Sequence, residues 1–340
     1  MNKQKIYILG IESSCDDTAA SILFNGKILS NIIATQSVHE KYGGVVPELA
    51  SRAHQQNIIP VVHQALESAG IDKEELSAVA FTRGPGLMGS LLVGISFAKS
   101  LAYGLNIPLI EVNHMQAHIL AHFIDKDGFE KPKFPFLAMT ISGGHTQIVK
   151  VDDYFKMEII GETIDDAVGE AFDKSGKILG FKYPAGPKID KLAKLGNSKA
   201  FNFTKPNVKG LNFSFSGLKT AILYFIKKKT KENPYFLEEN LNDICASIQY
   251  TIVEILIEKL KLAVEQTSIK RIAIGGGVSA NSGVREGLTR LKEKYGWETY
   301  IPSLEFTTDN AAMIAIVGYL KYLKKDFTKY NVTVGTRLKI

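Results

Sequence analysis

Cysteine is scarce in this sequence of 340 residues, which contains only Cys15 and Cys245. Two cysteines at unrelated positions exclude a disulfide framework and a cysteine-based zinc knuckle. Cys15 stands beside Asp16 and Asp17, whose negative charges disfavour a reactive thiolate. We therefore expect a structural role for Cys15.

Long hydrophobic runs and low-complexity tracts are also missing. The apolar stretch within residues 1–11 gives way to the charged Glu12 far too early for a signal peptide. The longest apolar run near the C-terminus, residues 311–320, is shorter than the about 20 residues that cross a bilayer. The hydrophobic fraction of 45% and the charged fraction of 22% are ordinary for a globular protein. The sequence thus predicts a soluble, cytoplasmic protein with no membrane association.

A strong charge of one sign is absent as well. The formal net charge of +6 permits a nucleic-acid partner without requiring one. The lysine clusters are small, as in residues 227–229 and 324–325, and each is more typical of a solvated helix face than of a phosphate-binding track. A length of 340 residues exceeds one comfortable hydrophobic core and favours two domains.

The two halves of the sequence open with the same pattern of apolar and polar segments. In the first half, two strand-like runs flank the polar turn at residues 12–18, and a third run follows Asn25-Gly26, a strong hairpin signal. In the second half, two strand-like runs flank Gly143-Gly144-His145, and a third run follows. This weak internal repeat predicts two related domains, joined by the polar residues 125–132.

A pair of histidines on a predicted helix is the first candidate metal site. Side chains four apart on a helix share one face, with Cβ atoms roughly 5–6 Å apart, so His114 and His118 can bind one metal ion together. Two imidazoles are too few for a firm site, and Asp309, at the start of the last long helix, is the best candidate for the missing carboxylate. His122 continues the same row and is an alternative ligand. The pair could also be ordinary histidines of a half-buried helix.

Three turns that directly follow apolar strands favour nucleotide binding. A turn whose backbone N–H groups face one way cradles an anion, and glycine lets the backbone approach a phosphate. Ser142-Gly143-Gly144 fits this description well, and Ser13–Asp16 occupies the corresponding place in the first half. Gly275-Gly276-Gly277 stands between a buried strand and a helix, where a phosphate can meet a helix N-terminus.

Acidic side chains stand along a predicted helix at residues 165–179. Asp165 and Asp166 are at its start, where carboxylates complement the helix dipole. Asp173 lies too far along the helix for that role. It is the better candidate for a hydrogen bond to a ligand hydroxyl.

Seven motifs stand out in order along the chain: Gly10–Thr18, His114–His118, Ser142–Thr146, Asp165–Lys174, Phe213–Lys219, Gly276–Asn281 and Thr308–Asn310. Together they resemble the tRNA N(6)-adenosine threonylcarbamoyltransferase family, and the bacterial form is the closer match. The resemblance extends from about residue 8 to about residue 318, which is nearly the whole chain.

The resemblance implies an α/β, actin-like ATPase (ASKHA) fold of two related domains. Each domain would hold a mixed sheet flanked by helices, with the ligand in the cleft between them. The first domain would comprise residues 1–124 and 305–330, and the second residues 133–304, with residues 125–132 as the linker.

The resemblance also implies the residues of the site. His114, His118 and Asp309 would hold a metal, and this set of two histidines and one carboxylate suits Fe²⁺, with Zn²⁺ as the alternative. Substrate contacts are implied for Thr140, Ile141, Ser142, Gly143, Gly144, Asp173, Gly186, Asp190 and Asn281. Two positions depart from the family pattern. Ala185, in place of a glycine, could narrow the pocket, and Arg83, in place of a small residue, could contact phosphate or tRNA.

The implied reaction moves the threonylcarbamoyl group from threonylcarbamoyl-AMP to tRNA. The acceptor is the N6 amine of the adenosine next to the anticodon, in tRNAs that read codons beginning with A, and AMP is released. No residue is a clear general base, and Asp16 and Asp17 are weak candidates. The expected partners are tRNA, a paralogous subunit of the same fold and a small ATPase.

Three other functions compete with this hypothesis. In zinc peptidases with paired histidines on a helix, a glutamate follows the first histidine, whereas this chain has Met115 and then Gln116. A plain ATPase or sugar kinase has the same fold, because fold does not fix function. A nucleotide-dependent scaffold would need no catalytic residues.

Overall fold

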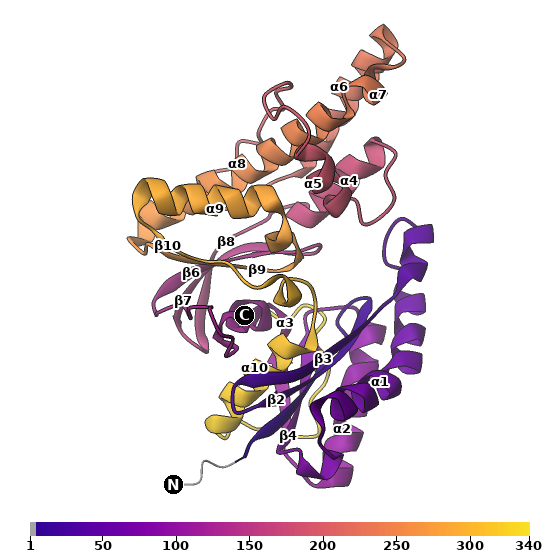
Figure 1. Ribbon diagram of the computed structural model, residues 1–340, viewed down its shortest axis with the longest axis vertical. Coiled ribbons are helices and arrows are strands. Elements are labelled where there is room, and N and C mark those ends of the chain that lie inside the picture. The colour runs from indigo at the N-terminus through magenta and orange to yellow at the C-terminus, as the bar shows by residue number, and fades with distance from the viewer. Residues whose placement is uncertain (1–4) are drawn as a thin grey trace. The chain divides into compact units, whose positions relative to one another are not determined.

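The computed structural model describes residues 5–340, apart from the side chain of Glu40. The chain forms two compact units (Figure 1). The first unit contains the residues up to Lys131 together with Asp309–Ile340, and the second unit contains Pro132–Thr308. The C-terminal segment of the chain therefore belongs to the same unit as the N-terminal strands.

The first unit is built on a five-stranded mixed sheet with the order β3-β2-β1-β4-β5. Neighbours in β3-β2-β1 are antiparallel, and neighbours in β1-β4-β5 are parallel. Its strands are β1 (Tyr7–Glu12), β2 (Asp17–Phe24), β3 (Lys27–Thr35), β4 (Ala78–Gly84) and β5 (Leu109–Asn113). Its α-helices are α1 (Pro47–Ala69), α2 (Met88–Leu105), α3 (His114–Leu120) and α10 (Ala311–Leu323). Short 3₁₀ turns are η1 (Ser37–Lys41), η2 (Lys73–Glu75) and η3 (Ala121–Phe123).

The predicted hairpin at Asn25-Gly26 is confirmed, because these two residues join β2 to β3 with positive φ angles of 48° and 94°. Two consecutive positive φ angles give the turn whose twist matches that of the flanking strands. Alternation along β1 then divides its side chains between the two faces of the sheet. Leu9 and Ile11 belong to the hydrophobic core that α1 and α2 cover.

Helix α10 lies close against β1 and β4 because glycines leave room for it. A Cβ atom on Gly10 would stand 2.5 Å from the Ala311 carbonyl oxygen, and one on Gly318 would stand 2.4 Å from the Ala80 Cβ. Real Cβ contacts are never this short, so larger residues at these positions would push α10 away from the sheet. This close packing fixes the segment just before α10, which carries Asp309.

Helix α2 is also notable for its composition. It is the one described helix that is long and apolar enough to cross a membrane by length and composition alone. One face of it, with Leu91, Ile95 and Ala98, is buried in the first unit. A core helix of this kind passes the same test of length and composition.

The second unit repeats the topology of the first, with the strand order β10-β9-β6-β7-β8. Its strands are β6 (Phe136–Ile141), β7 (Thr146–Asp153), β8 (Lys156–Glu162), β9 (Arg271–Gly275) and β10 (Glu298–Tyr300). Its helices are α4 (Val168–Ile178), α5 (Gly186–Ala193), α6 (Ser216–Glu232), α7 (Phe236–Glu239), α8 (Leu241–Thr267) and α9 (Ser282–Tyr295), with 3₁₀ turns η4 (Gly277–Ala280) and η5 (Leu304–Phe306). The two mixed sheets confirm the predicted α/β class and the predicted relation between the halves.

Helix α4 begins at Val168 and not at Asp165 as predicted. The Asp165 carboxylate instead accepts hydrogen bonds from the Ser214 hydroxyl (2.5 Å), the Phe215 N–H (2.8 Å) and the Ser216 hydroxyl (2.7 Å). Burial raises the pKa of Asp165, but these bonds outweigh it and hold the pKa below its ordinary value. Asp165 therefore anchors the start of α6, and the predicted role in the dipole of α4 is wrong.

Candidate active site

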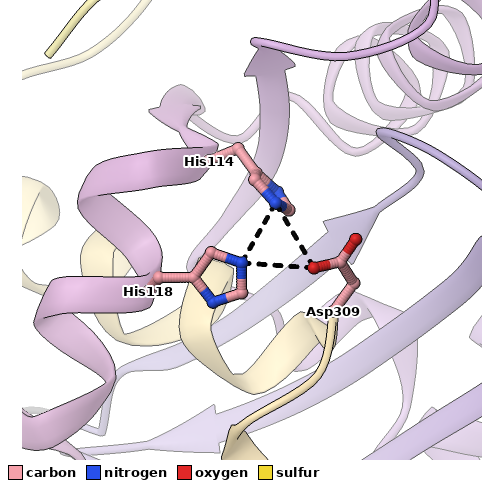
Figure 2. Close-up of side chains that lie close together, drawn as sticks. All are labelled: His114, His118 and Asp309. Carbon is pink, nitrogen blue, oxygen red and sulfur yellow. Dashed lines mark hydrogen bonds and ion pairs between the residues drawn. The ribbon is translucent and has the colours of Figure 1, made fainter. Parts of the chain in front are cut away.

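Three side chains predicted to bind a metal point toward one another in the first unit (Figure 2). His114 is the first residue of α3, directly after β5, and His118 lies one turn further along the same helix. Asp309 lies just before the cap of α10. The Asn113 side chain fixes the first turn of α3, because its Oδ1 atom accepts hydrogen bonds from the N–H groups of Met115 (2.9 Å) and Gln116 (3.2 Å).

The spacing of the three ligand atoms fits one metal ion. The Oδ1 atom of Asp309 lies 3.3 Å from Nε2 of His114 and 3.2 Å from Nε2 of His118, and these two nitrogens are 3.2 Å apart. Neighbouring ligands on one ion with bonds of about 2.1 Å lie roughly 3.0–3.4 Å apart. Both imidazoles are buried, so a cation would satisfy lone pairs that water cannot reach. His122 lies in η3 and is not part of this group.

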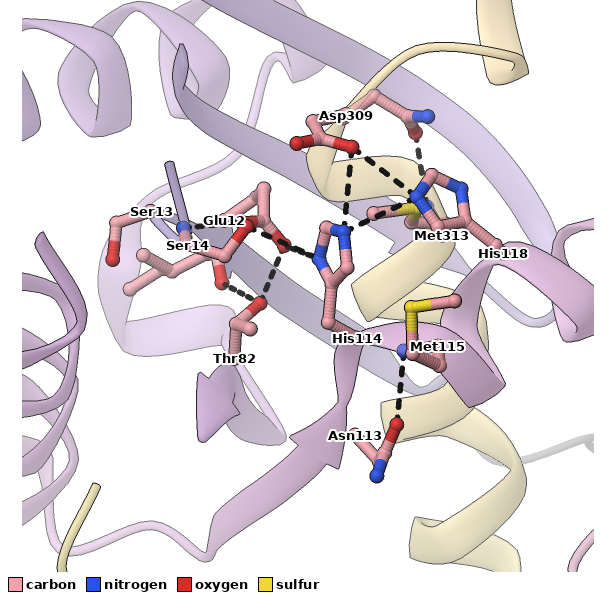
Figure 3. Close-up of polar contacts among 12 residues, drawn as sticks. Glu12, Ser13, Ser14, Thr82, Asn113, His114, Met115, His118, Asp309 and Met313 are labelled. Atoms are coloured by element: carbon pink, nitrogen blue, oxygen red, sulfur yellow. Dashed lines mark hydrogen bonds and ion pairs between the residues drawn. The ribbon is translucent and has the colours of Figure 1, made fainter. Parts of the chain in front are cut away.

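A buried carboxylate contacts the second ring nitrogen of His114, Nδ1 (Figure 3). Glu12, at the end of β1, is fully buried, and its Oε2 atom lies 3.0 Å from Nδ1 of His114. The same oxygen accepts a hydrogen bond from the Thr82 hydroxyl at 2.6 Å, and Oε1 accepts one from the Ser14 N–H at 2.5 Å. Because Nδ1 of His114 faces Glu12, its Nε2 atom is left to face Asp309. A carboxylate in this place typically sets the tautomer and orientation of a metal-binding histidine.

Sequence reasoning gave Glu12 no role, although its position was visible as the charged end of an apolar strand. The contact depends on β1 and β4 being neighbours, which places Thr82 beside it, and on α3 following the next strand. No spacing in the sequence carries that information.

The buried charges at this centre influence one another. Burial by itself lowers the pKa of His114, but the carboxylates of Glu12 and Asp309 outweigh it and raise the pKa well above its ordinary value. Burial by itself raises the pKa of Glu12 and of Asp309, but His114 outweighs it in both cases and both pKa values are lowered. These shifts favour the protonated form of His114 in the metal-free centre, and a metal ion held at Nε2 would take the place of that proton.

We expect Glu12→Gln to weaken metal binding about 10–100-fold, the usual loss when a partner of a metal-binding histidine is removed. Glutamine keeps the size of the side chain and an oxygen for the Thr82 hydroxyl, but it removes the charge that orients His114. Competition with a chelator of known affinity measures the change. Thr82→Val is the control and should weaken binding less, and equal affinity in Glu12→Gln and the native chain would contradict the assigned role.

The two weak candidates for a general base lie where the chain enters β2, with Asp16 at the end of the loop after β1 and Asp17 as the first residue of β2. Burial, followed by repulsion from Asp16 and Asp309, raises the pKa of Asp17 to about 7. Its Oδ1 atom is buried and has no hydrogen-bond partner in the described part of the chain. Such a carboxyl group can gain and lose a proton near neutral pH. Asp17 is therefore better suited to proton transfer than its sequence position alone indicated.

Buried side chains also form hydrogen bonds with the loop between β1 and β2 and with the start of β2. Nε2 of His54 and the Ser90 hydroxyl lie 3.0 Å from the Cys15 carbonyl oxygen, and Nδ1 of His54 lies 2.8 Å from the Thr18 hydroxyl. Burial, more than the neighbouring acids, raises the pKa of the Cys15 thiol. A reactive thiolate is thus disfavoured, as the sequence predicted, although the larger cause is burial.

In the second unit, the predicted nucleotide turns meet at the carboxyl ends of β6 and β9. These strands are parallel neighbours, and Thr140 pairs with Gly275. Gly276 has a φ of 88°, and a Cβ atom there would stand 2.5 Å from the Ile141 carbonyl oxygen. Only glycine fits this place. Ser142-Gly143-Gly144 closes the turn after β6, with the Ser142 N–H donating to the His145 carbonyl oxygen at 2.9 Å. Ligands of α/β sheets bind outside such strand ends.

Two hydroxyl groups near these strand ends lack a hydrogen-bond partner. The Thr140 hydroxyl, in β6, and the Ser279 hydroxyl, in η4, are buried, and neither has a partner among the described residues. Buried polar atoms are normally paired, so these two positions are unusual. Ser279 was not predicted, although it stands in the segment after the third glycine turn.

The remaining predicted contacts hold loops of the second unit in place. Asp173 accepts a hydrogen bond from the Ala185 N–H at 2.7 Å, and burial raises its pKa although the N–H groups of Ala185 and Gly186 lower it. Asp190 accepts hydrogen bonds from the N–H (3.2 Å) and hydroxyl (2.6 Å) of Ser282. Asn281 caps α9 through the Val284 N–H.

Known proteins match this chain over nearly its full length. The family model described as tRNA N6-adenosine threonylcarbamoyltransferase matches residues 27–316. A protein of that name from Christiangramia forsetii is 73% identical over 339 residues, covering 100% of both chains. Another from Riemerella anatipestifer is 60% identical over 338 residues, covering 99% of both.

Solved structures show the same fold at much lower identity. Component A of the (R)-2-hydroxyglutaryl-CoA dehydratase of Acidaminococcus fermentans superposes with a TM-score of 0.53 at 19% identity, covering 94% of this chain and 99% of that one. HypF of T. kodakarensis superposes with a TM-score of 0.58 at 14% identity, covering 96% of this chain and 49% of that one. Both have the actin-like ATPase fold, which confirms the predicted fold class. The fold, the family model and the full-length relatives agree, and the chain belongs to the family of tRNA N6-adenosine threonylcarbamoyltransferases.

Proposed function

We propose that this chain transfers the threonylcarbamoyl group of threonylcarbamoyl-AMP to the N6 amine of the adenosine next to the anticodon, in tRNAs that read codons beginning with A. The observation that carries the proposal is the group formed by the two buried imidazoles of His114 and His118 with the partly exposed Asp309, supported by Glu12 in a chain of this family. AMP leaves when the amine attacks the carbamoyl carbon. An adenine amine is a weak nucleophile, so positioning and charge stabilisation must supply most of the rate.

His114, His118 and Asp309 would hold the metal, which we propose to be Fe²⁺, with Zn²⁺ as the alternative. When bound, such an ion supplies Lewis acidity and orients the oxygen atoms of the substrate. Glu12 keeps Nε2 of His114 directed toward Asp309 by accepting a hydrogen bond from Nδ1. Thr82 and Ser14 keep Glu12 itself in place.

The strand ends of the second unit would bind the adenylate. Close to these strand ends lie the buried hydroxyls of Thr140 and Ser279, which have no partner in the described part of the protein. The turn Ser142-Gly143-Gly144 offers backbone N–H groups, and nothing stands within 4 Å of a Cβ atom on either glycine. Asp173 and Asp190 position the neighbouring backbone, at Ala185–Gly186 and at the start of α9.

The proton of the attacking amine needs an acceptor. Asp17 is the side chain we assign to this role, because its pKa of about 7 leaves much of it ionised at neutral pH while it can still hold a proton.

Asp173→Ala should weaken binding of the adenylate about 10–100-fold and leave tRNA binding unchanged. The carboxyl group holds the backbone N–H of Ala185, and hydrogen bonds to charged groups contribute about 1.5–3 kcal/mol. Calorimetry with AMP and filter binding with tRNA measure the two affinities. Glu170→Ala, an exposed acid on the same helix, is the control and should change neither. A parallel loss of both affinities in Asp173→Ala would indicate a folding defect and contradict the assignment.

The proposed reaction is tested by mass analysis of tRNA nucleosides. The chain is incubated with threonylcarbamoyl-AMP, tRNA and two proposed partner proteins. These partners are a paralogous subunit of the same fold and a small ATPase, and we propose that all three proteins are cytoplasmic. Threonylcarbamoyladenosine should form together with AMP. Cleavage of a protein substrate would favour a peptidase, and phosphate transfer to a small alcohol without tRNA would favour a kinase.

A further inference from the structure

The last residues of the first unit form no helix or strand, yet hydrogen bonds join them to β5, to α2 and to the end of β4. The path begins at the open edge of β5. The Thr328 N–H donates to the Leu109 carbonyl oxygen at 2.7 Å, and the Glu111 N–H donates to the Thr328 hydroxyl at 2.7 Å. The match to the family model ends at residue 316, so this segment lies beyond it.

Further along, the segment is bonded to α2 and to the end of β4. The Lys99 ammonium donates to the Val332 carbonyl oxygen at 2.6 Å, and Nε of Arg83 donates to the Thr333 carbonyl oxygen at 3.1 Å. Arg83 also pairs with Glu111, at 3.0 Å, so its guanidinium is already engaged within the protein. A Cβ atom on Gly84 would stand 1.9 Å from the Gly335 carbonyl oxygen, so only glycine lets the segment lie this close.

The end of the segment reaches the metal-binding helix. Nδ2 of Asn113 donates to the Lys339 carbonyl oxygen at 3.0 Å, while Oδ1 of the same side chain caps α3. The two ends of one amide thus connect the C-terminal segment to the helix that carries both histidines. Figure 3 shows Asn113 below His114, bonded to the N–H of Met115.

A second connection passes through the loop after β4. The Gly86 N–H donates to the Thr336 carbonyl oxygen at 3.3 Å, and the next residue, Leu87, donates its N–H to the Ser14 carbonyl oxygen at 2.8 Å. The Ser14 hydroxyl in turn lies 3.2 Å from Nδ1 of His114. Both connections from the segment therefore end at His114 or at its helix.

We propose that residues 328–339 act as a strap that holds α3 in its metal-binding position, with Asn113 as the positioning residue that joins strap and helix. Among the described residues, the strap forms no hydrogen bond to the side chains of His114, His118 or Asp309. It works by restricting the orientation of Asn113, and through Asn113 the first turn of α3 and His114. This inference rests on the metal site proposed above, but the coupling of strap to helix is testable without metal.

The test uses three variants of the full protein in complex with its partners or alone. Asn113→Ser keeps a capping oxygen at the start of α3 but is too short to reach Lys339. Deletion of residues 337–340 keeps Asn113 and Thr336 and removes the Lys339 carbonyl. The third variant combines the two changes. Asn106→Ser, the same substitution at the C-terminal cap of α2, is the control, since the Asn106 N–H bonds to Ala102 and Tyr103 within α2.

Each single change should weaken Fe²⁺ or Zn²⁺ binding about 10-fold, and the combined variant should lose no more than either alone, because both changes break one link. In the metal-free protein, amide hydrogen exchange at Met115 and Gln116 should be faster in all three variants. Asn106→Ser should bind metal within about twofold of the native chain. Thermal unfolding of each metal-free variant checks that the fold is retained.

Unchanged metal affinity and unchanged exchange in the single variants would overturn the strap, as would a combined loss equal to the sum of the two. If the native chain binds no metal, the metal site itself fails. The exchange at Met115 and Gln116 in the deletion variant, where Asn113 is unchanged, then still decides whether the strap holds α3.

Discussion

Replacing His114 and His118 together by alanine is expected to reduce bound metal from about one ion per chain to background, because only Asp309 would remain and one carboxylate does not hold a transition metal firmly. Formation of threonylcarbamoyladenosine should fall with it. Elemental analysis of the purified protein measures the first loss, and mass analysis of tRNA nucleosides measures the second.

The loss must be separated from unfolding, because His114 is the charged partner of a buried carboxylate. Removing His114 leaves Glu12 uncompensated, and breaking a buried pair in this way costs about 3–5 kcal/mol. Adding Glu12→Gln to the double variant removes that charge and should restore thermal stability without restoring metal. His122→Ala is the control and should keep its metal. Normal metal content in the double variant would move the site elsewhere on the chain.

Asp17→Asn is expected to slow threonylcarbamoyl transfer about 10²–10⁴-fold, the usual contribution of a positioned general base. In the native enzyme the rate should fall about tenfold for each pH unit below the pKa of Asp17, since only the ionised carboxylate accepts a proton. That pKa is about 7 in the metal-free protein. A cation at Asp309 removes one of the repulsions that raise it, so the midpoint in the loaded enzyme should lie at or below pH 7. The variant should lack this acidic limb.

The stability of Asp17→Asn distinguishes lost catalysis from lost structure. A carboxyl group whose pKa is raised on folding binds more protons in the folded than in the unfolded state between its two pKa values. Its contribution to stability therefore falls as the pH rises from about 4 to about 7. Asparagine needs no ionisation, so Asp17→Asn should melt at the same or a higher temperature at pH 8. Asp16→Asn is the matched control and should keep an acidic limb, moved to lower pH because one repulsion that raises the pKa of Asp17 is removed. A native rate that is flat across this pH range would contradict the role of Asp17.

Much of the fold was predictable because its signals are local. The hairpin at Asn25-Gly26 and the strand–turn–strand pattern at the start of each half depend on neighbouring residues, and the structure places both as predicted. The predicted start of α4 was wrong by about one turn. Asp165 does not begin this helix because its carboxylate is hydrogen-bonded to residues about fifty positions away, at Ser214–Ser216. A helix-start pattern cannot register such a contact.

The candidate site was predictable only in part, for the same reason. The pairing of His114 with His118 follows from helical spacing, whereas the approach of Asp309 depends on α10 packing against β1 through Gly10 and Gly318. Glu12 was missed because its side-chain partners Thr82 and His114 come from β4 and α3, far from it in the sequence. The strap residues after 327 carry no periodic pattern, and their carbonyl contacts leave no trace in side-chain types.

The most direct test of the account measures the metal dependence of the modified nucleoside. Metal-stripped protein is incubated with its partners, threonylcarbamoyl-AMP and tRNA, with and without Fe²⁺ or Zn²⁺. We predict that threonylcarbamoyladenosine and AMP form together in the native chain only after metal is restored, and that restoring metal has no effect on the His114→Ala, His118→Ala double variant. Equal product from the stripped native chain, or from the double variant, would contradict the account.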